Sequence, residues 1–115
     1  MPIKFSLGRT QWRAFQTTSG LGKLPWYKQV DVGPSIDKFW TAYQAYDNDP
    51  SLKNLLTAEE KAKALKSAFA KFAVRKATTS GLTNPQWNQI QGWIEELDEI
   101  IKEDYLKKDY VKRHK

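Results

Sequence analysis

Residues 82–111 read LTNPQWNQIQGWIEELDEIIKEDYLKKDYV, and this stretch decides the fold class. Thr83 and Gln86 have the spacing of a capping box, and Pro85 stands in the first turn, where its missing N–H breaks no helical hydrogen bond. Apolar residues then recur every three or four positions and so share one face of a helix: Trp87, Ile90, Ile94, Leu97, Ile101 and Tyr105. We therefore predict one long helix over residues 83–112, in which about 28 helical residues would span about 42 Å.

A second helix is predicted upstream, over residues 57–78. Thr57 and Glu60 have the spacing of another capping box. A narrow apolar seam follows at helical spacing, made of Ala62, Leu65, Phe69 and Phe72. Because only a short break separates this helix from the long one, the two should form an antiparallel hairpin. The longer helix should then extend beyond its partner at its C-terminal end.

The third predicted helix covers residues 35–47, SIDKFWTAYQAYD. Ser35 is its expected N-cap, and Asp37 would interact favourably with the positive end of the helix dipole. Its apolar face comprises Ile36, Phe39, Trp40, Tyr43 and Tyr46. We expect this helix to pack across the hairpin, with one further helical turn over residues 50–55.

Residues 1–34 show the least regular pattern. Ile3, Phe5 and Leu7 alternate with polar residues, which fits one short strand or an extended arm. Thr10 is the expected cap of a short helix that ends near Thr17. Glycines and prolines then indicate a loop over residues 19–34, whose apolar side chains should pack across the helices.

Together these patterns predict a mainly all-α single domain of 115 residues. It should be a small bundle of three to four helices with a long C-terminal helix and an irregular N-terminal segment that holds at most one strand. We divide the chain into an arm at residues 1–34, a bundle at 35–112 and a basic tail at 113–115. Neither a signal peptide nor a transmembrane segment is visible, which favours the cytoplasm and leaves export without a signal open.

Charge is distributed unevenly along the chain, whose net charge is +6. Residues 82–106 contain six acidic residues and one lysine, whereas residues 57–81 contain six basic and two acidic residues. A basic helix lying against an acidic one would be electrostatically self-consistent, so the pattern has a purely structural interpretation. A chain with this net charge could alternatively bind nucleic acid.

Residue types that support catalysis or metal binding are scarce. There is no cysteine, and the single histidine, His114, stands next to the C-terminus, where we expect fraying. A zinc site needs several thiolate or imidazole ligands, and a general acid needs burial to raise its pKa. We therefore predict a protein that is not an enzyme and that has no catalytic residue, no bound cofactor and no metal site.

Fifteen aromatic residues are the unusual feature of the composition. Interface cores favour Trp, Tyr and Arg, so we predict a protein–protein interaction module such as an adaptor, inhibitor, chaperone or structural subunit, with another protein as partner. The candidate partner-binding residues are Arg9, Trp12, Arg13, Lys23, Trp26, Tyr27 and Lys28.

For each tryptophan taken singly, burial in the core is the favoured alternative. The second functional hypothesis is nucleic-acid binding by the same basic and aromatic residues together with the basic helix at 57–78. Against it, lysines outnumber arginines 15 to 4, and arginine is the usual base reader.

Overall fold

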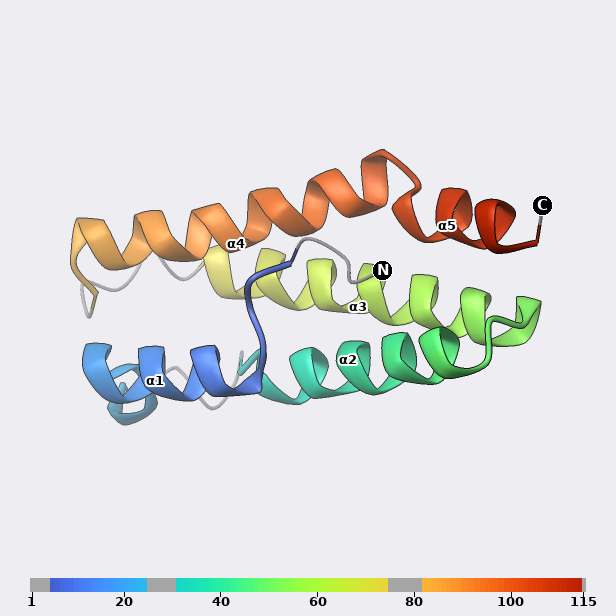
Figure 1. The fold of residues 1–115 in the computed structure, drawn as a ribbon. Coiled ribbons are helices and arrows are strands. Elements are labelled where there is room, and N and C mark those ends of the chain that lie inside the picture. The colour runs from blue at the N-terminus through green and yellow to red at the C-terminus, as the bar shows by residue number, and fades with distance from the viewer. Residues whose placement is uncertain (1–4, 25–30, 75–81, 115) are drawn as a thin grey trace.

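The structure is a computed structural model that describes residues 5–24, 31–74 and 82–114. Within these ranges the chain forms five α-helices, one 3-10 helix and no strand (Figure 1). The elements are α1 (Arg9–Ser19), η1 (Leu21–Lys23), α2 (Gly33–Asn48), α3 (Leu52–Val74), α4 (Asn84–Lys102) and α5 (Tyr105–Arg113). The prediction of a mainly all-α chain is confirmed, and the number of helices is larger than the three or four predicted.

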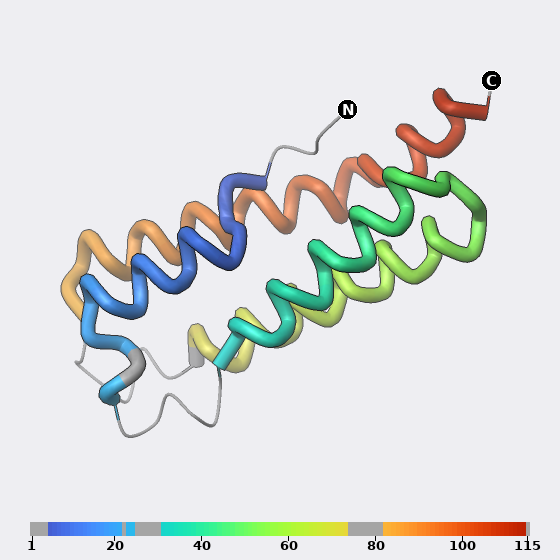
Figure 2. Tube along the Cα trace, turned by 60° about the horizontal axis from the view of Figure 1, so that its bottom comes forward, coloured from blue at the N-terminus to red at the C-terminus, as the bar shows by residue number. Residues whose placement is uncertain are grey.

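The helices form an elongated bundle that measures 49 × 21 × 19 Å. Helix α3 lies in the middle and packs most extensively on α2, with further contacts to α4 and α5. Both α2 and α4 run antiparallel to α3, as Figure 1 shows. In Figure 2, α1 lies beside α4 and α2 lies beside α3, so α1 and α2 cover successive parts of the bundle's length.

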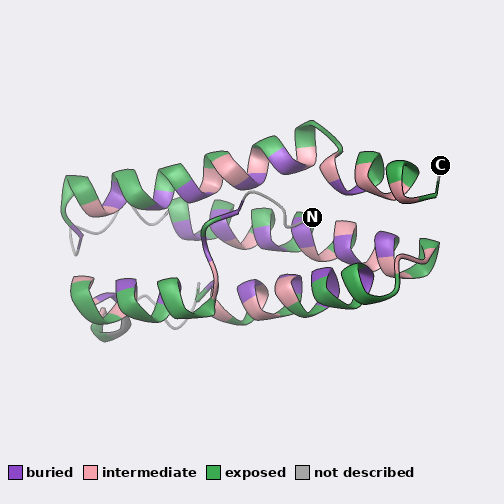
Figure 3. Cartoon of the chain, viewed as in Figure 1, coloured by how far each residue is buried: buried purple, intermediate pink, exposed green. Residues whose placement is uncertain are grey.

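One continuous hydrophobic core runs along the bundle and takes residues from every α-helix. The predicted seams of α3 and α4 contribute these buried residues to it: Ala62, Leu65, Phe69, Phe72, Trp87, Ile90 and Leu97. Figure 3 colours buried positions purple, and they recur along both helices. The segment before α1 joins this core, because Phe5 and Leu7 are buried. The Trp40 indole donates a hydrogen bond of 2.8 Å to the Leu7 carbonyl oxygen, which fixes the segment across α2. Residues 5–8 are extended but form no strand, and Ile3 lies outside the described residues.

The start of α3 corrects the prediction at Thr57. The helix begins at Leu52, and the Thr57 hydroxyl donates to the Lys53 carbonyl oxygen at 3.0 Å, as an interior threonine does. Ser51 is the residue that caps the first turn, since its Oγ accepts from the Asn54 N–H at 3.2 Å. The further turn predicted at residues 50–55 is therefore continuous with the helix that follows it.

The N-termini of the first two helices also differ from the prediction. Helix α1 begins at Arg9 with Gly8 as its N-cap, so Thr10 is not the capping residue, and it continues to Ser19. Helix α2 begins at Gly33 rather than after Ser35, with Pro34 in its first turn. Asp31 Oδ1 accepts from the Gly33 N–H at 2.8 Å and satisfies one of the amides that a helix start leaves free.

The predicted long C-terminal helix is broken after Lys102. Asp104 has a φ of 51° in the left-handed region, which separates α4 from α5. Because α3 begins five residues earlier than predicted, its first turns provide a surface for α5, and Leu106 is buried there. The expected overhang is therefore wrong: the C-terminal helix packs against α3.

Candidate functional site

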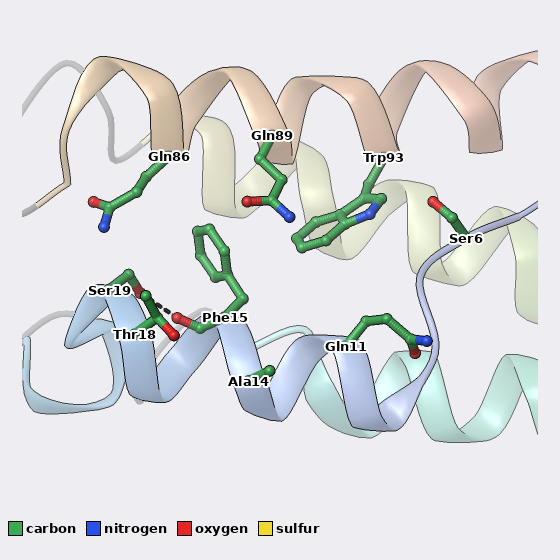
Figure 4. A pocket seen from close by; sticks show the side chains of 9 residues that line it. All are labelled: Ser6, Gln11, Ala14, Phe15, Thr18, Ser19, Gln86, Gln89 and Trp93. Atoms are coloured by element: carbon green, nitrogen blue, oxygen red, sulfur yellow. Dashed lines mark hydrogen bonds between the residues drawn. The ribbon is translucent and has the colours of Figure 1, made fainter.

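A cleft with a volume of about 450 Å³ lies between α1 and α4. Phe15 from α1 and Trp93 from α4 form its base (Figure 4). Their ring centroids are 5.4 Å apart and their planes meet at 77°, an edge-to-face geometry. The rest of the lining consists of Ser6, Gln11, Ala14, Thr18, Ser19, Gln86 and Gln89. None of these described lining residues carries a charge, so we call it the uncharged cleft.

Aromatic rings hold α1 at this end of the bundle. The Trp12 ring stacks on Phe15 at 5.6 Å and meets the edges of Phe69, Phe72 and Trp93 at 6.0–6.2 Å. Phe15 and Trp93 are each 6% exposed, so their apolar surface is almost entirely used in packing. Large side chains between α1 and α4 keep the two helices apart and leave room for the cleft at the surface.

Two glutamines of the cleft are oriented by the helices that they begin. Gln11 Oε1 accepts from the Gly8 N–H at 3.0 Å, and Gln86 Oε1 accepts from the Thr83 N–H at 2.8 Å. A backbone N–H can only donate, so each amide must present its oxygen to the backbone and keep its NH₂ group for other partners. A Cβ at position 8 would lie 2.8 Å from Gln11 Oε1, which explains how glycine permits this contact.

Some of the other polar side chains of the cleft form hydrogen bonds within the protein, and others do not. Ser19 Oγ donates to the Phe15 carbonyl oxygen at 2.6 Å and accepts from the Leu21 N–H at 3.2 Å. Ser6 Oγ donates to Glu96 Oε1 at 2.6 Å. The Thr18 hydroxyl, the Gln89 amide and the Trp93 indole N–H form no hydrogen bond in the described structure.

None of the predicted partner-binding residues that the structure describes lines this cleft. Arg9, Trp12 and Arg13 line a separate groove of about 190 Å³ against the start of α2, together with Asp31 and Asp37. Arg9 Nε is 3.5 Å from Asp37 Oδ2, so this arginine is already paired.

Exposure separates the predicted residues further. Trp12 is 2% exposed, so it is a core residue, as the alternative interpretation of the tryptophans held, and its assignment to a binding surface is corrected. Arg13 and Lys23 are exposed. Trp26, Tyr27 and Lys28 lie outside the described residues.

The charge complementarity expected between the third and last predicted helices is formed in part. Lys66 Nζ lies 3.1 Å from Asp98 Oδ1, and this is the one ion pair between α3 and α4 within the described ranges. Glu96 instead accepts hydrogen bonds from Ser6. Glu95 and Glu99 are exposed, as expected for a solvated face.

A second polar cluster closes the opposite end of the bundle, and we call it the C-terminal clasp: Tyr46, Asp47, Asp109 and Arg113. Asp109 Oδ2 accepts from the Tyr46 hydroxyl at 2.9 Å and from Arg113 Nε at 2.8 Å. Arg113 also pairs with the Asp47 carboxylate. Burial and the bond to Asp109 raise the pKa of Tyr46, while the bond to Asp47 raises the pKa of Arg113.

The clasp changes the expectation for the basic tail. Arg113 belongs to α5, and His114 Nε2 lies 2.6 Å from the Pro50 carbonyl oxygen. The predicted fraying at His114 is therefore wrong, because the end of α5 rests on the turn between α2 and α3.

Sequence reasoning identified Gln86 only as a capping residue and missed the site that it lines. Gln89 had no distinguishing signal, because an exposed glutamine on a helix looks like any solvated position. Phe15 and Trp93 are apolar residues of two helices that are far apart in the sequence, and their meeting across the bundle depends on tertiary packing. The second capping amide, Gln11, was hidden by the expected helix start at Thr10.

Comparisons with protein-family models, curated proteins and solved structures give no match for this chain. Among the helices of the described ranges, none has the length and apolar character needed to cross a bilayer. The same residues contain no group of three or more histidine, cysteine, aspartate or glutamate side chains arranged to hold a metal ion.

Proposed function

We propose that this chain is a small, non-enzymatic protein-interaction module that receives a segment of a partner protein in the uncharged cleft. The observation that carries the proposal is the cleft itself, with two aromatic rings at its base and unpaired polar groups at its rim. Its volume of about 450 Å³ lies within the range of ligand-binding pockets. Protein interfaces combine an aromatic centre with a polar rim in the same way.

Nucleic-acid binding is the second candidate function. In its favour, Arg9 and Arg13 stand one helical turn apart on α1 and line one groove. Two observations weigh against it: Arg9 pairs with Asp37, and Asp31 lines the same groove. Carboxylates at this position would repel a phosphate backbone.

Affinity capture from a lysate of the source cells, with a blocked variant, distinguishes the two candidates. Ala14 lines the cleft and is exposed, so Ala14→Arg should fill the cleft without disturbing the core. Thr17→Arg is the matched control, since it adds the same charge to an exposed position of α1 outside the cleft lining.

We expect a discrete protein that is captured by the wild type and by Thr17→Arg, survives nuclease and salt, and is lost with Ala14→Arg. Equal capture by all three proteins would contradict the assignment of the cleft. Capture that disappears with nuclease and falls steeply with salt would favour nucleic acid, because phosphate contacts release counterions.

A further inference from the structure

The hydrogen bonds described for the uncharged cleft occupy amide oxygens and leave N–H donors unused. Gln11 and Gln86 have their amide oxygens bound to backbone N–H groups, so their NH₂ groups remain available. The Trp93 indole N–H forms no hydrogen bond in the described parts of the chain and can only donate. Thr18 and Gln89 add groups that can donate or accept. A ligand that satisfies this cleft must therefore be rich in acceptors.

Charge narrows the class of ligand. No cationic side chain among the described residues lines the cleft, and the Glu96 carboxylate lies at its edge, bound to Ser6. An anionic ligand would lose its hydration there and gain no countercharge, which is costly. The acceptors should therefore be neutral carbonyl oxygens rather than carboxylates or phosphates.

The backbone of an ordinary extended peptide brings one N–H donor with each carbonyl, and these donors would depend on the oxygens of Thr18 and Gln89 and on the remaining lone pairs of the other cleft oxygens. Proline supplies the carbonyl without the N–H. A proline-rich segment also adopts the polyproline II conformation before binding, which lowers the entropy lost on association. Grooves that bind such segments are lined by aromatic residues, and here the small parts of Phe15 and Trp93 that stay exposed, 6% of each residue, form the base.

We propose that the uncharged cleft binds a neutral, proline-rich segment of the partner protein, with its carbonyl oxygens accepting from Gln11, Gln86 and Trp93. This inference rests on the proposed function and specifies the chemistry of the partner. Gln89 and Thr18, whose side chains bind no other described residue, adjust to the residues between the prolines.

The direct test is a titration of the ¹⁵N-labelled protein with a peptide of five Ala-Pro repeats, blocked at both ends so that it carries no charge. The side-chain NH₂ signals of the cleft glutamines and the indole N–H signal of Trp93 should shift together and saturate. A blocked peptide of five Ala-Gln repeats, which keeps every backbone N–H, should shift them less at the same concentration.

Two variants remove single contacts. Trp93→Phe keeps a ring and deletes the indole donor, and Gln89→Leu deletes the free amide. Each should weaken binding about 3- to 10-fold, the usual effect of one hydrogen bond. Gln91→Leu is the control, because Gln91 is exposed on α4 and does not line the cleft. Thermal midpoints measured on all three variants separate lost binding from lost folding.

The inference is overturned if the Ala-Pro peptide leaves these signals unchanged, or if the Ala-Gln peptide binds as tightly as the Ala-Pro peptide. It is also overturned if the signals shift with maltohexaose, a neutral oligosaccharide, and not with the Ala-Pro peptide. A peptide-display selection separates this failure from that of the proposed function. Selected peptides that are poor in proline, yet no longer bind Ala14→Arg, would overturn the proline-rich ligand and support the interaction module. A selection in which no peptide depends on the cleft would overturn both.

Discussion

The two ends of the bundle are held together by different kinds of contact. At one end, the C-terminal clasp joins α2 to α5 through a tyrosine, two carboxylates and an arginine that satisfy one another. At the other end, aromatic rings join α1 to α3 and α4, while several polar groups between α1 and α4 have no hydrogen-bond partner among the described residues. The clasp uses its hydrogen-bonding capacity within the molecule, and the cleft keeps part of it for a ligand.

The largest loss of stability is expected from substitutions in the hydrophobic core that both ends share. Phe69 and Leu97 are each 1% exposed, and Phe69 packs on Trp12 of α1. Phe69→Ala and Leu97→Ala should each lower the free energy of unfolding by about 2–5 kcal/mol, through lost burial and the cavity left behind. Denaturant midpoints measure the change in stability. Unchanged midpoints would mean that these two side chains do not stabilise the core.

The second largest loss of stability is expected from a substitution in the C-terminal clasp. Asp109→Ala removes the acceptor of the buried Tyr46 hydroxyl and of Arg113 Nε. We expect a loss of about 1–3 kcal/mol, because a buried donor is left unsatisfied.

A nearby exposed pair provides the control for the clasp. Lys108 Nζ lies 3.6 Å from Glu103, and both side chains are largely exposed. Lys108→Ala should change stability by less than about 0.5 kcal/mol. Equal losses in the two variants would show that the clasp is no stronger than a surface ion pair.

Alkaline pH should weaken the clasp end selectively. Burial, followed by the hydrogen bond to Asp109, raises the pKa of Tyr46 above its ordinary value near 10. The unfolded chain then loses this proton at a lower pH than the folded chain. Stability from Tyr46 is therefore fully present below pH 10 and is lost above it, by up to about 1.4 kcal/mol per pH unit.

Stability measured against pH tests this, with Tyr46→Phe as the comparison. Burial also raises the pKa of Tyr105, so some alkaline loss should persist in the variant. The slope above pH 10 should nevertheless become shallower in Tyr46→Phe. An identical slope would show that the Tyr46 hydroxyl is not the group that titrates.

The smallest difference in stability is expected at Asp104, where the helix breaks between α4 and α5 and lets α5 reach the clasp. Asp104 has a φ of 51°, where glycine is favoured over residues with a Cβ. Asp104→Gly should be more stable than Asp104→Ala by about 1 kcal/mol. In one uninterrupted helix the order would be reversed, because alanine is the better helix former. The sign of this difference, measured by thermal unfolding, therefore decides between a broken and a continuous helix.

The break at Asp104 shows where sequence reasoning stops. The buried faces of α3 and α4 were readable because Phe69, Leu97 and their neighbours repeat at helical spacing. The spacing continues from Ile101 to Tyr105 without glycine or proline, so nothing local indicates an end. The break depends on how far α3 extends, which was itself misjudged because Thr57 and Glu60 imitate a capping box inside a helix.

The binding residues were harder to predict for a related reason. Arginines and tryptophans close together in sequence suggested one surface, but a helix turns by 100° per residue. Arg13 and Phe15 consequently contribute to different grooves of α1. Capping patterns indicated where a helix begins, as at Gln86, but not that two such beginnings lie across one cleft.

The capping glutamines also limit how the cleft can change during evolution. Gln11 and Gln86 each bind the first backbone amides of a helix, so a substitution that alters recognition there also weakens a helix start. Thr18 and Gln89 make no such contact with the backbone. New partner preferences should therefore accumulate first at these two positions, where sequence can drift without cost to the fold.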